Sequence, residues 1–145
     1  MPVRRHIWTT IGSCLATAFL LWPLPAPAAN PTRLPPLPLD GKLLELPGTG
    51  PVLRVKDKDF PLIARTTWLL HTLQDKRLVN HEIRVEGEWQ PDGTLKVNHF
   101  YTIHDGKLFR VRYFCETCNI EALEPGNCIC CQEPTEMQEI PVAPK

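Results

Sequence analysis

The sequence predicts an α+β fold that is mostly β: a small antiparallel meander with one helix, followed by a cysteine-rich loop. Apolar and polar residues alternate through most of residues 82–114, a pattern typical of half-buried strands. One stretch, 66–80, instead has the helical spacing of apolar residues. Five cysteines lie between Cys115 and Cys131, and the chain has six in all. We therefore expect a single β-rich domain at 39–140, with a cysteine cluster at its C-terminal end.

Residues 1–28 are predicted to be a signal peptide. Arg4 and Arg5 form a positive region, an uncharged apolar run follows, and small residues suit cleavage after Ala28. The paired arginines suit the basic start of an ordinary secretion signal, which we favour, and they also fit a twin-arginine signal, whose export route carries folded proteins. We expect an exported protein, periplasmic or extracellular. No stable membrane span is expected after cleavage, because the apolar run is short for a bilayer and is diluted by polar residues.

A proline-rich tether is expected at 29–38. Residues 23–38 contain seven prolines, which favour extended, polyproline-like chain rather than a packed core. The domain then begins near Leu39, where Asp40 and Gly41 give a turn signal before an apolar strand.

The first half of the domain is expected to hold a second short strand and the single helix. Val52, Leu53 and Val55 predict the strand, and the charged run at 56–59 reads as a solvated loop. The helix is predicted over 66–80, with a threonine at its start as the N-cap. Its expected apolar stripe consists of Trp68, Leu69, Leu70 and Leu73.

Three antiparallel strands are predicted after the helix, separated by the turns at 91–93 and 104–107. The alternation places one set of side chains on a common face of the middle strand. This set is Leu95, Val97, His99, Tyr101 and Ile103. Residues 135–140 are expected to return as an edge strand, and 141–145 as a frayed tail. A sheet this small can bury its faces by curling onto the helix, and an OB-like, partly closed barrel is one such arrangement.

The spacing of the cysteines predicts a metal site. Pairing Cys128 with Cys131 gives two C-x2-C knuckles, which together supply the four thiolates that a tetrahedral ion needs. The predicted ligands are Cys115, Cys118, Cys128 and Cys131, with Cys130 as an alternate. Asn119 follows the first knuckle, where a positive φ is expected and asparagine is tolerated. Zinc is the expected metal, and iron in a rubredoxin-like centre is the alternative.

Two other interpretations of the same cysteines stay open. Disulfides are natural in an exported protein, but five cysteines after the signal peptide leave one unpaired. A redox-active dithiol at Cys115 and Cys118 lacks the following helix that such motifs use. Attachment of c-type haem is excluded, because Asn119 and Gln132 stand where histidine is required.

The stretch from Phe114 to Glu133 also resembles the C-terminal signature of a group of uncharacterised exported bacterial proteins. The resembling residues are F-C-x-x-C-N-I and then P-G-x-C-x-C-C-Q-E. An L-D-G-K start and a D-G-K hairpin complete the likeness, which covers most of the chain after the signal peptide. The resemblance implies that the cysteine loop is a family feature, and no activity comes with it.

Charge and motifs limit the functions to be expected. The formal net charge is zero, so nucleic acid is not an expected partner. No nucleophile triad, carboxylate pair or phosphate loop is present, and His99 and His104 are weak candidates to approach a metal. We therefore expect an exported, zinc-stapled binding module that is not an enzyme and that acts on an unidentified protein or envelope partner. Redox chemistry or metal handling in the cell envelope is the alternative. Arg110 and Arg112 are expected either to stabilise the thiolates or to face solvent.

Overall fold

The structure is a computed structural model that describes residues 34–143. The predicted signal peptide, Cys14 and the first half of the predicted tether (29–33) lie outside these residues. Within them the chain forms eight strands and one short helix, in the order β1 (Leu39–Leu46), β2 (Gly50–Val55), β3 (Lys58–Ala64), α1 (Thr67–Leu73), β4 (Glu82–Trp89), β5 (Leu95–His104), β6 (Lys107–Cys115), β7 (Ile120–Ala122) and β8 (Glu136–Pro141). The prediction of a mostly β fold with one helix is confirmed.

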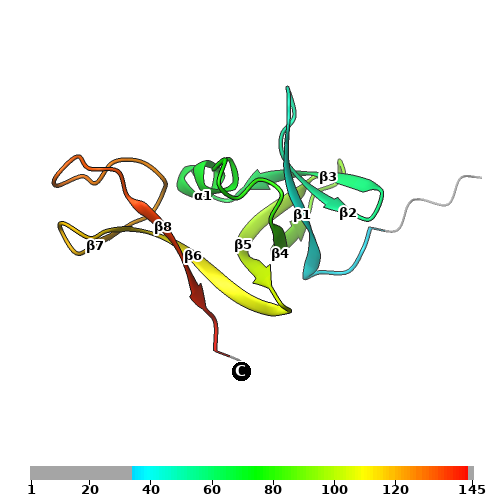
Figure 1. Cartoon of the computed structure of the whole chain (residues 1–145). Helices are drawn as coiled ribbons and strands as arrows, with labels where there is room; N and C mark the ends of the chain where they lie inside the picture. The colour runs from blue at the N-terminus through cyan, green and yellow to red at the C-terminus, as the bar shows by residue number, and fades with distance from the viewer. Residues whose placement is uncertain (1–33, 144–145) are drawn as a thin grey trace, which may run out of the picture. The chain divides into compact units, whose positions relative to one another are not determined.

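Five strands close into a barrel (Figure 1). Antiparallel pairing runs in the order β3-β2-β1-β4-β5, and a parallel pairing of β3 with β5 closes the ring. At the closure Leu62 lies opposite Leu95, and Ala64 lies opposite Val97. The helix connects β3 to β4, as in an OB-like barrel. Closure satisfies the backbone groups that an open sheet would leave at its edges.

The barrel encloses an aliphatic core. Its buried members come from β1 to β5 and from the helical segment between β3 and β4: Leu39, Leu43, Leu53, Leu62, Leu69, Leu73, Leu78, Ile83, Val85, Leu95, Val97 and Phe100. Trp89 packs at the margin of this core, and its indole Nε1 donates to the Pro35 carbonyl oxygen at 2.8 Å. The last residues of the predicted tether therefore lie against the barrel.

The face predicted for β5 is only half right, because a β-bulge interrupts it. Glu86 lies opposite His99 and Gly87 opposite Val97, so Asn98 is an extra residue on β5. Such an insertion shifts the inward-facing positions by one residue. Leu95 and Val97 are buried as expected, whereas beyond the bulge Phe100 and Thr102 replace His99, Tyr101 and Ile103 on the buried side.

Gly87 permits this bulge. A Cβ atom built at this position would lie 2.0 Å from the Lys96 carbonyl oxygen. The backbones of β4 and β5 therefore approach each other more closely here than any side chain allows.

The helix is shorter than the prediction of 66–80. Thr66 is its N-cap, and its side chain accepts from the Leu69 amide, as expected for a threonine at that place. The helix ends at Leu73, because the Asp75 carboxylate captures the Arg77 amide and the chain continues in turns. Of the predicted stripe, Leu69 and Leu73 are buried, but Trp68 is 41 % exposed.

Two expectations for the first three strands were wrong. Asp40 and Gly41 do not form a turn, because they pair with β4 inside β1. The charged run at 56–59 is not wholly a loop either, since Lys58 and Asp59 begin β3. β3 was not predicted, because Pro61 interrupts the strand pattern.

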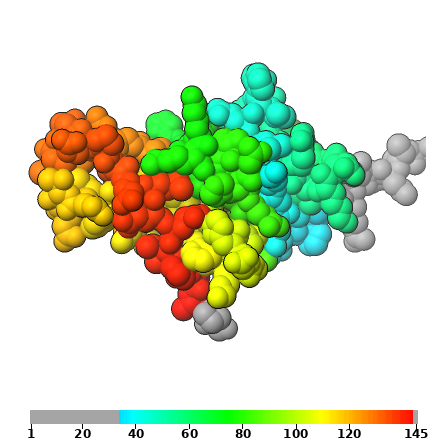
Figure 2. Space-filling view, viewed as in Figure 1, coloured from blue at the N-terminus to red at the C-terminus, as the bar shows by residue number. Residues whose placement is uncertain are grey.

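β6, β7 and β8 form an arm that extends away from the barrel (Figure 1). Only the first residues of β6 pair with β5. Beyond them, β8 pairs with one edge of β6 and β7 with the other. The predicted edge strand is thus confirmed as β8, which extends to Pro141, while β7 was not predicted. In Figure 2 the segment from about the end of β6 to the start of β8 projects as a separate lobe. Among the described residues, no helix has the length and apolar character needed to cross a membrane.

Candidate metal centre

The first cysteine pair lies in the hairpin between β6 and β7. Cys115 ends β6 and pairs with Ile120 at the start of β7. The chain reverses over Cys118 and Asn119, and Asn119 has φ +54°. The predicted left-handed residue after the first knuckle is therefore present, and the pairing on either side of the turn fixes the direction of both cysteines.

The second pair lies in an irregular loop with its own backbone hydrogen bonds. The Cys128 amide donates to the Glu133 carbonyl oxygen at 2.7 Å, and the Gln132 amide donates to the Cys128 carbonyl oxygen at 2.9 Å. Gln132, which follows Cys131, has φ +61°. A positive φ thus follows the second cysteine of each pair, so the two turns are similar. Glutamine gave no sequence signal of this, because it seldom adopts that conformation.

The two turns bring four sulfurs together. The Sγ atoms of Cys115, Cys118, Cys128 and Cys131 all lie within 4.8 Å of one another. The Sγ atoms of Cys115 and Cys131 are 3.4 Å apart. Zinc bound tetrahedrally by thiolates at about 2.3 Å requires sulfur–sulfur separations of about 3.8 Å. The residues present therefore fit a tetrahedral thiophilic ion after small movements of side chains.

Backbone donors favour a thiolate at Cys128, whereas neighbouring thiols and burial oppose ionisation at Cys118 and Cys115. Cys115 and Cys128 are buried, while Cys118 and Cys131 are half-buried. The backbone N–H groups of Cys131 and Cys130 lower the pKa of Cys128 to about 7. In contrast, the neighbouring thiols of Cys130 and Cys131 raise the pKa of Cys118. A cation supplies the charge that lets several adjacent thiols ionise together.

Cys130 differs from the other four cysteines of the loop. Its side chain is exposed, and its Sγ does not belong to the group of mutually close sulfurs. Its backbone amide donates to the Cys128 Sγ at 3.4 Å, so it contributes to the turn through its main chain. All five cysteines of the described chain are free thiols, and none is joined in a disulfide.

Other polar residues singled out in the sequence do not reach the sulfurs. His104 pairs with Lys107 at the start of β6, whereas Cys115 ends that strand. Eight residues of strand separate these ends, or about 26 Å. His104 instead lies beside His81 and Glu139, two residues that the sequence did not identify.

The two arginines of β6 are engaged elsewhere. Arg110 donates to Glu121 at 2.9 Å, and Arg112 donates to the Gln138 side chain at 2.8 Å. These contacts join β6 to β7 and to β8, so the arginines hold the arm together rather than stabilise thiolates.

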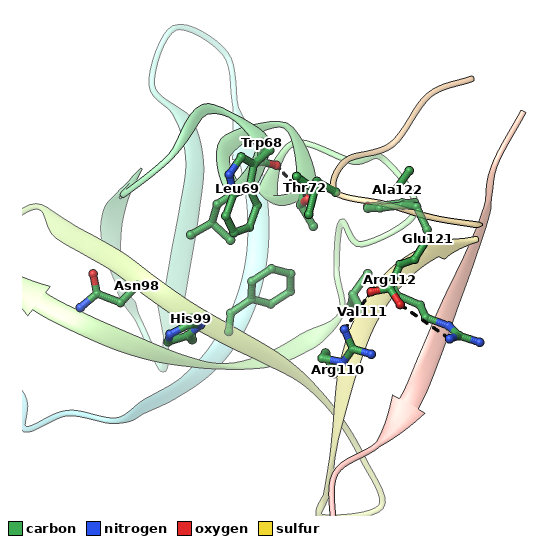
Figure 3. A pocket seen from close by; sticks show the side chains of 13 residues that line it. Trp68, Leu69, Thr72, Asn98, His99, Arg110, Val111, Arg112, Glu121 and Ala122 are labelled. Carbon is green, nitrogen blue, oxygen red and sulfur yellow. Dashed lines mark hydrogen bonds and ion pairs between the residues drawn. The ribbon is translucent and has the colours of Figure 1, made fainter. Parts of the chain in front are cut away.

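A shallow cavity of about 250 Å³ lies between the helix and the strands β5, β6 and β7 (Figure 3). Trp68 and Leu69 line its helix side, and His99, Arg110 and Glu121 line its strand side. The charged groups in it already pair with each other. This cavity presents no cluster of metal-ligating or nucleophilic groups comparable to the four thiols.

The fold and the site define a small OB-like barrel that carries a thiol cluster on a projecting arm. No family model, curated protein or solved structure matches the chain. The likeness to the exported cysteine-loop proteins therefore remains an expectation from the sequence. A barrel of this kind does not by itself indicate a function, which has to be argued from the site.

Proposed function

We propose that this protein is an exported binding module whose arm is stapled by one zinc ion. The ligands are Cys115, Cys118, Cys128 and Cys131. The observation that carries the proposal is that two similar turns bring these four Sγ atoms within 4.8 Å of one another. Four thiolates complete a tetrahedral shell and leave no position for a substrate, which favours a structural role over a catalytic one.

The arm has a clear need for such a staple. Between Glu116 and Pro134, in the described chain, Cys128 is the one residue that is fully buried. This segment therefore has almost no apolar core of its own. Small units of this kind usually depend on a metal or on disulfides for their stability.

Exposed apolar residues on the arm support a binding role. Ile129 is 88 % exposed and Leu123 72 % exposed, and both lie next to the thiol cluster in the chain. A metal that holds the loop would hold these side chains in place for a partner. Large contiguous patches of exposed apolar surface mark interaction sites, and these two side chains are candidates for such a patch.

Elemental analysis of the purified, exported chain tests the staple. We expect one thiol-bound zinc per chain, so that the zinc content falls by one equivalent on substitution of Cys118 by serine and is unchanged on substitution of Cys130. A protein that is fully folded without any metal contradicts the proposal.

Crosslinking in intact cells tests the binding role. A photoreactive residue at Ile129 should form a discrete adduct that disappears when Cys128 is also replaced by serine. The same photoreactive residue placed at Lys56, in the turn between β2 and β3, is the control and should form no adduct. An adduct of equal yield at both positions, or at neither, contradicts a partner specific to the arm.

Metal handling or redox chemistry is the second candidate, favoured by one observation. Cys130 is an exposed free thiol beside a cluster that already has four sulfurs. A thiol so placed can receive a metal ion in transfer or pair with a ligand upon oxidation. Visible absorption by the purified protein would identify iron, whereas a colourless protein that neither exchanges metal nor forms a disulfide rules this candidate out.

Export is proposed from the N-terminal sequence alone. Replacing Arg4 and Arg5 by lysines should trap the precursor in the cytoplasm if the twin-arginine route carries the metal-loaded fold. Immunoblotting of cell fractions would detect the processing of this double variant. Unchanged processing would indicate ordinary secretion instead.

A further inference from the structure

We propose that His81, His104 and Glu139 form a second metal site, which takes a divalent transition-metal ion, with zinc as the first choice. One ligand atom from each of the three residues lies within 4.8 Å of the other two. The cluster lies at the barrel end of β6, and the thiols lie at the other end. It does not depend on the thiol site, so either site can exist without the other.

The three side chains come from separate elements. His81 immediately precedes β4, His104 ends β5, and Glu139 lies on β8. The Nε2 atom of His104 is 2.8 Å from Glu139 Oε1, and the Nδ1 atom of His81 is 3.8 Å from the same oxygen. Two ligands of one ion at about 2.0–2.1 Å stand about 3.0–3.4 Å apart. One observed separation is slightly shorter than this range and the other slightly longer, so small side-chain rotations would bring all three ligand atoms to one ion.

His81 supplies the observation that a simple ion pair does not explain. Its Nδ1 atom is buried and has no hydrogen-bond partner, although it lies toward Glu139. A separation of 3.8 Å is too long for a hydrogen bond. Buried polar atoms in proteins usually have a bonding partner, and an ion bound between His81 and Glu139 would provide one for this nitrogen.

The backbone holds these groups in place. The Leu43 amide donates to the His81 carbonyl oxygen at 2.9 Å, and the Asn80 amide donates to the Leu43 carbonyl oxygen at 2.8 Å. The His104 ring packs edge-on against Phe109, with ring centroids 5.1 Å apart. Glu139 is fixed by the pairing of β8 with β6. Ligands on paired strands keep the spacing that a metal site needs.

The donor set and its exposure indicate the kind of ion and the kind of site. Two imidazoles and one carboxylate suit zinc and other first-row transition metals, and unlike four thiolates they leave coordination positions open. The His104 side chain is 42 % exposed, so water or a small ligand can reach such an ion. Burial alone would raise the pKa of Glu139, but the hydrogen bond with His104 and the other neighbouring groups together outweigh it and lower this pKa.

Calorimetric titration of Zn²⁺ into protein whose thiols are already saturated with zinc tests the inference. We expect one further equivalent to bind. Substitutions His81→Asn, His104→Gln and Glu139→Gln should each weaken it by at least about 10-fold, the loss that even outer-sphere partners of a metal cause. His99→Gln, on the same strand as His104, and Glu136→Gln, on the same strand as Glu139, are the matched controls and should bind as the parent does.

Two further readouts separate metal binding from a structural role. Co²⁺ at this site should give ligand-field bands without the near-ultraviolet thiolate charge-transfer band of a cysteine site. In NMR spectra, Zn²⁺ should shift the ring signals of His81 and His104 and leave those of His71 and His99 in place. The inference is overturned if no further equivalent binds, or if all three ligand variants bind it as tightly as the parent. It is also overturned if the parent binds no metal here and the variants merely melt at lower temperature. The three residues would then form only a hydrogen-bonded cluster.

Discussion

The barrel and the arm of this protein are held together by different means. The barrel encloses a continuous set of leucine, isoleucine and valine side chains, among them Leu43, Ile83 and Leu95, which are wholly buried. The outer part of the arm, between Glu116 and Pro134, buries a single cysteine. The one region is stabilised by removal of apolar surface from water, whereas the other offers little such surface to remove.

This difference shows how a short segment can be ordered without a core. Full burial of one aliphatic side chain contributes about 1.5–3 kcal/mol. A structural zinc bound by thiolates contributes on the order of 10 kcal/mol. One ion can therefore take the place of several core residues, provided that its ligands are brought to a common point.

The two regions are joined at defined contacts. The start of β6 pairs with β5 of the barrel, and the hydroxyl of the buried Tyr113 donates to Asp75 at 2.8 Å. His71 on the helix also contacts Glu124, just beyond β7. Four predictions test how far each region depends on its own means of stabilisation, from the largest expected effect to the smallest.

The largest effect is expected from removal of the proposed metal. Substitution of Cys118 by serine, under reducing conditions, should unfold the arm between residues 116 and 134 while the barrel stays folded, because none of the four thiols lies in the barrel core. The free energy lost in the arm should be on the order of 10 kcal/mol. Hydrogen exchange should then show loss of protection between residues 116 and 134 and retained protection in β1 to β5. Equal loss in both regions would show that they are not separate.

A cavity in the barrel should have the converse effect. Leu43 is fully buried, so substitution by alanine should lower the free energy of unfolding by about 2–5 kcal/mol. Metal content should remain at the parent value. Ile129→Ala is the control, because its exposed side chain should change stability by less than about 0.5 kcal/mol. Urea unfolding with parallel metal analysis provides the measurement, and loss of metal in the leucine variant would contradict the separation.

The junction should be sensitive to acid through Asp75. Burial alone would raise the pKa of this carboxyl, but hydrogen bonds from Arg77 and Tyr113 outweigh it and lower the pKa below its usual 3.8. Because folding lowers this pKa, the stabilisation is present above 3.8 and is lost as the pH falls through the folded value.

Asp75→Asn should therefore lower stability at neutral pH by about 1.5–3 kcal/mol, the usual contribution of a hydrogen bond to a charged group. The same variant should lose less stability than the parent between about pH 4 and pH 2. Asp59→Asn, which disrupts an exposed pair with Arg54, should change stability little and serves as the control. Thermal melts across this pH range make the comparison, and parallel curves for parent and Asp75→Asn would exclude the carboxylate as the cause.

The smallest effect is expected at Cys130. Its serine variant should keep stoichiometric metal and a melting temperature close to that of the parent, because its sulfur lies outside the group of four. Cys131→Ser is the matched variant and should lose the metal. If instead Cys130→Ser lost the metal and Cys131→Ser kept it, the second knuckle would be Cys128 with Cys130.

Much of the fold was predictable because local patterns report burial directly. Alternation identified β4, β5 and β6, and Asp-Gly at 105–106 identified the hairpin between the last two. β3 was missed because Pro61 and a charged start obscure its pattern, although the chain pairs it on both sides. β7 was missed because three residues are too few to show a period.

The grouping of the four cysteines was also readable from the sequence, since equal C-x2-C spacing implies two similar turns. Asn119 marked the first turn, but Gln132 gave no such signal for the second. His81 and Glu139 were unreadable for a different reason. They are separated by 58 positions, and only the pairing of β8 with β6 brings Glu139 beside the end of β5.

The sequence by itself thus determined the mostly β class, the position of the helix start and the place of the thiols, because each depends on neighbours within a few residues. Closure of the barrel by β3 and β5, the bulge at Asn98 and the meeting of His81, His104 and Glu139 were decided only by the tertiary structure. These features arise where distant strands pair, and the register of such pairing is set by packing of the whole core rather than by any local pattern.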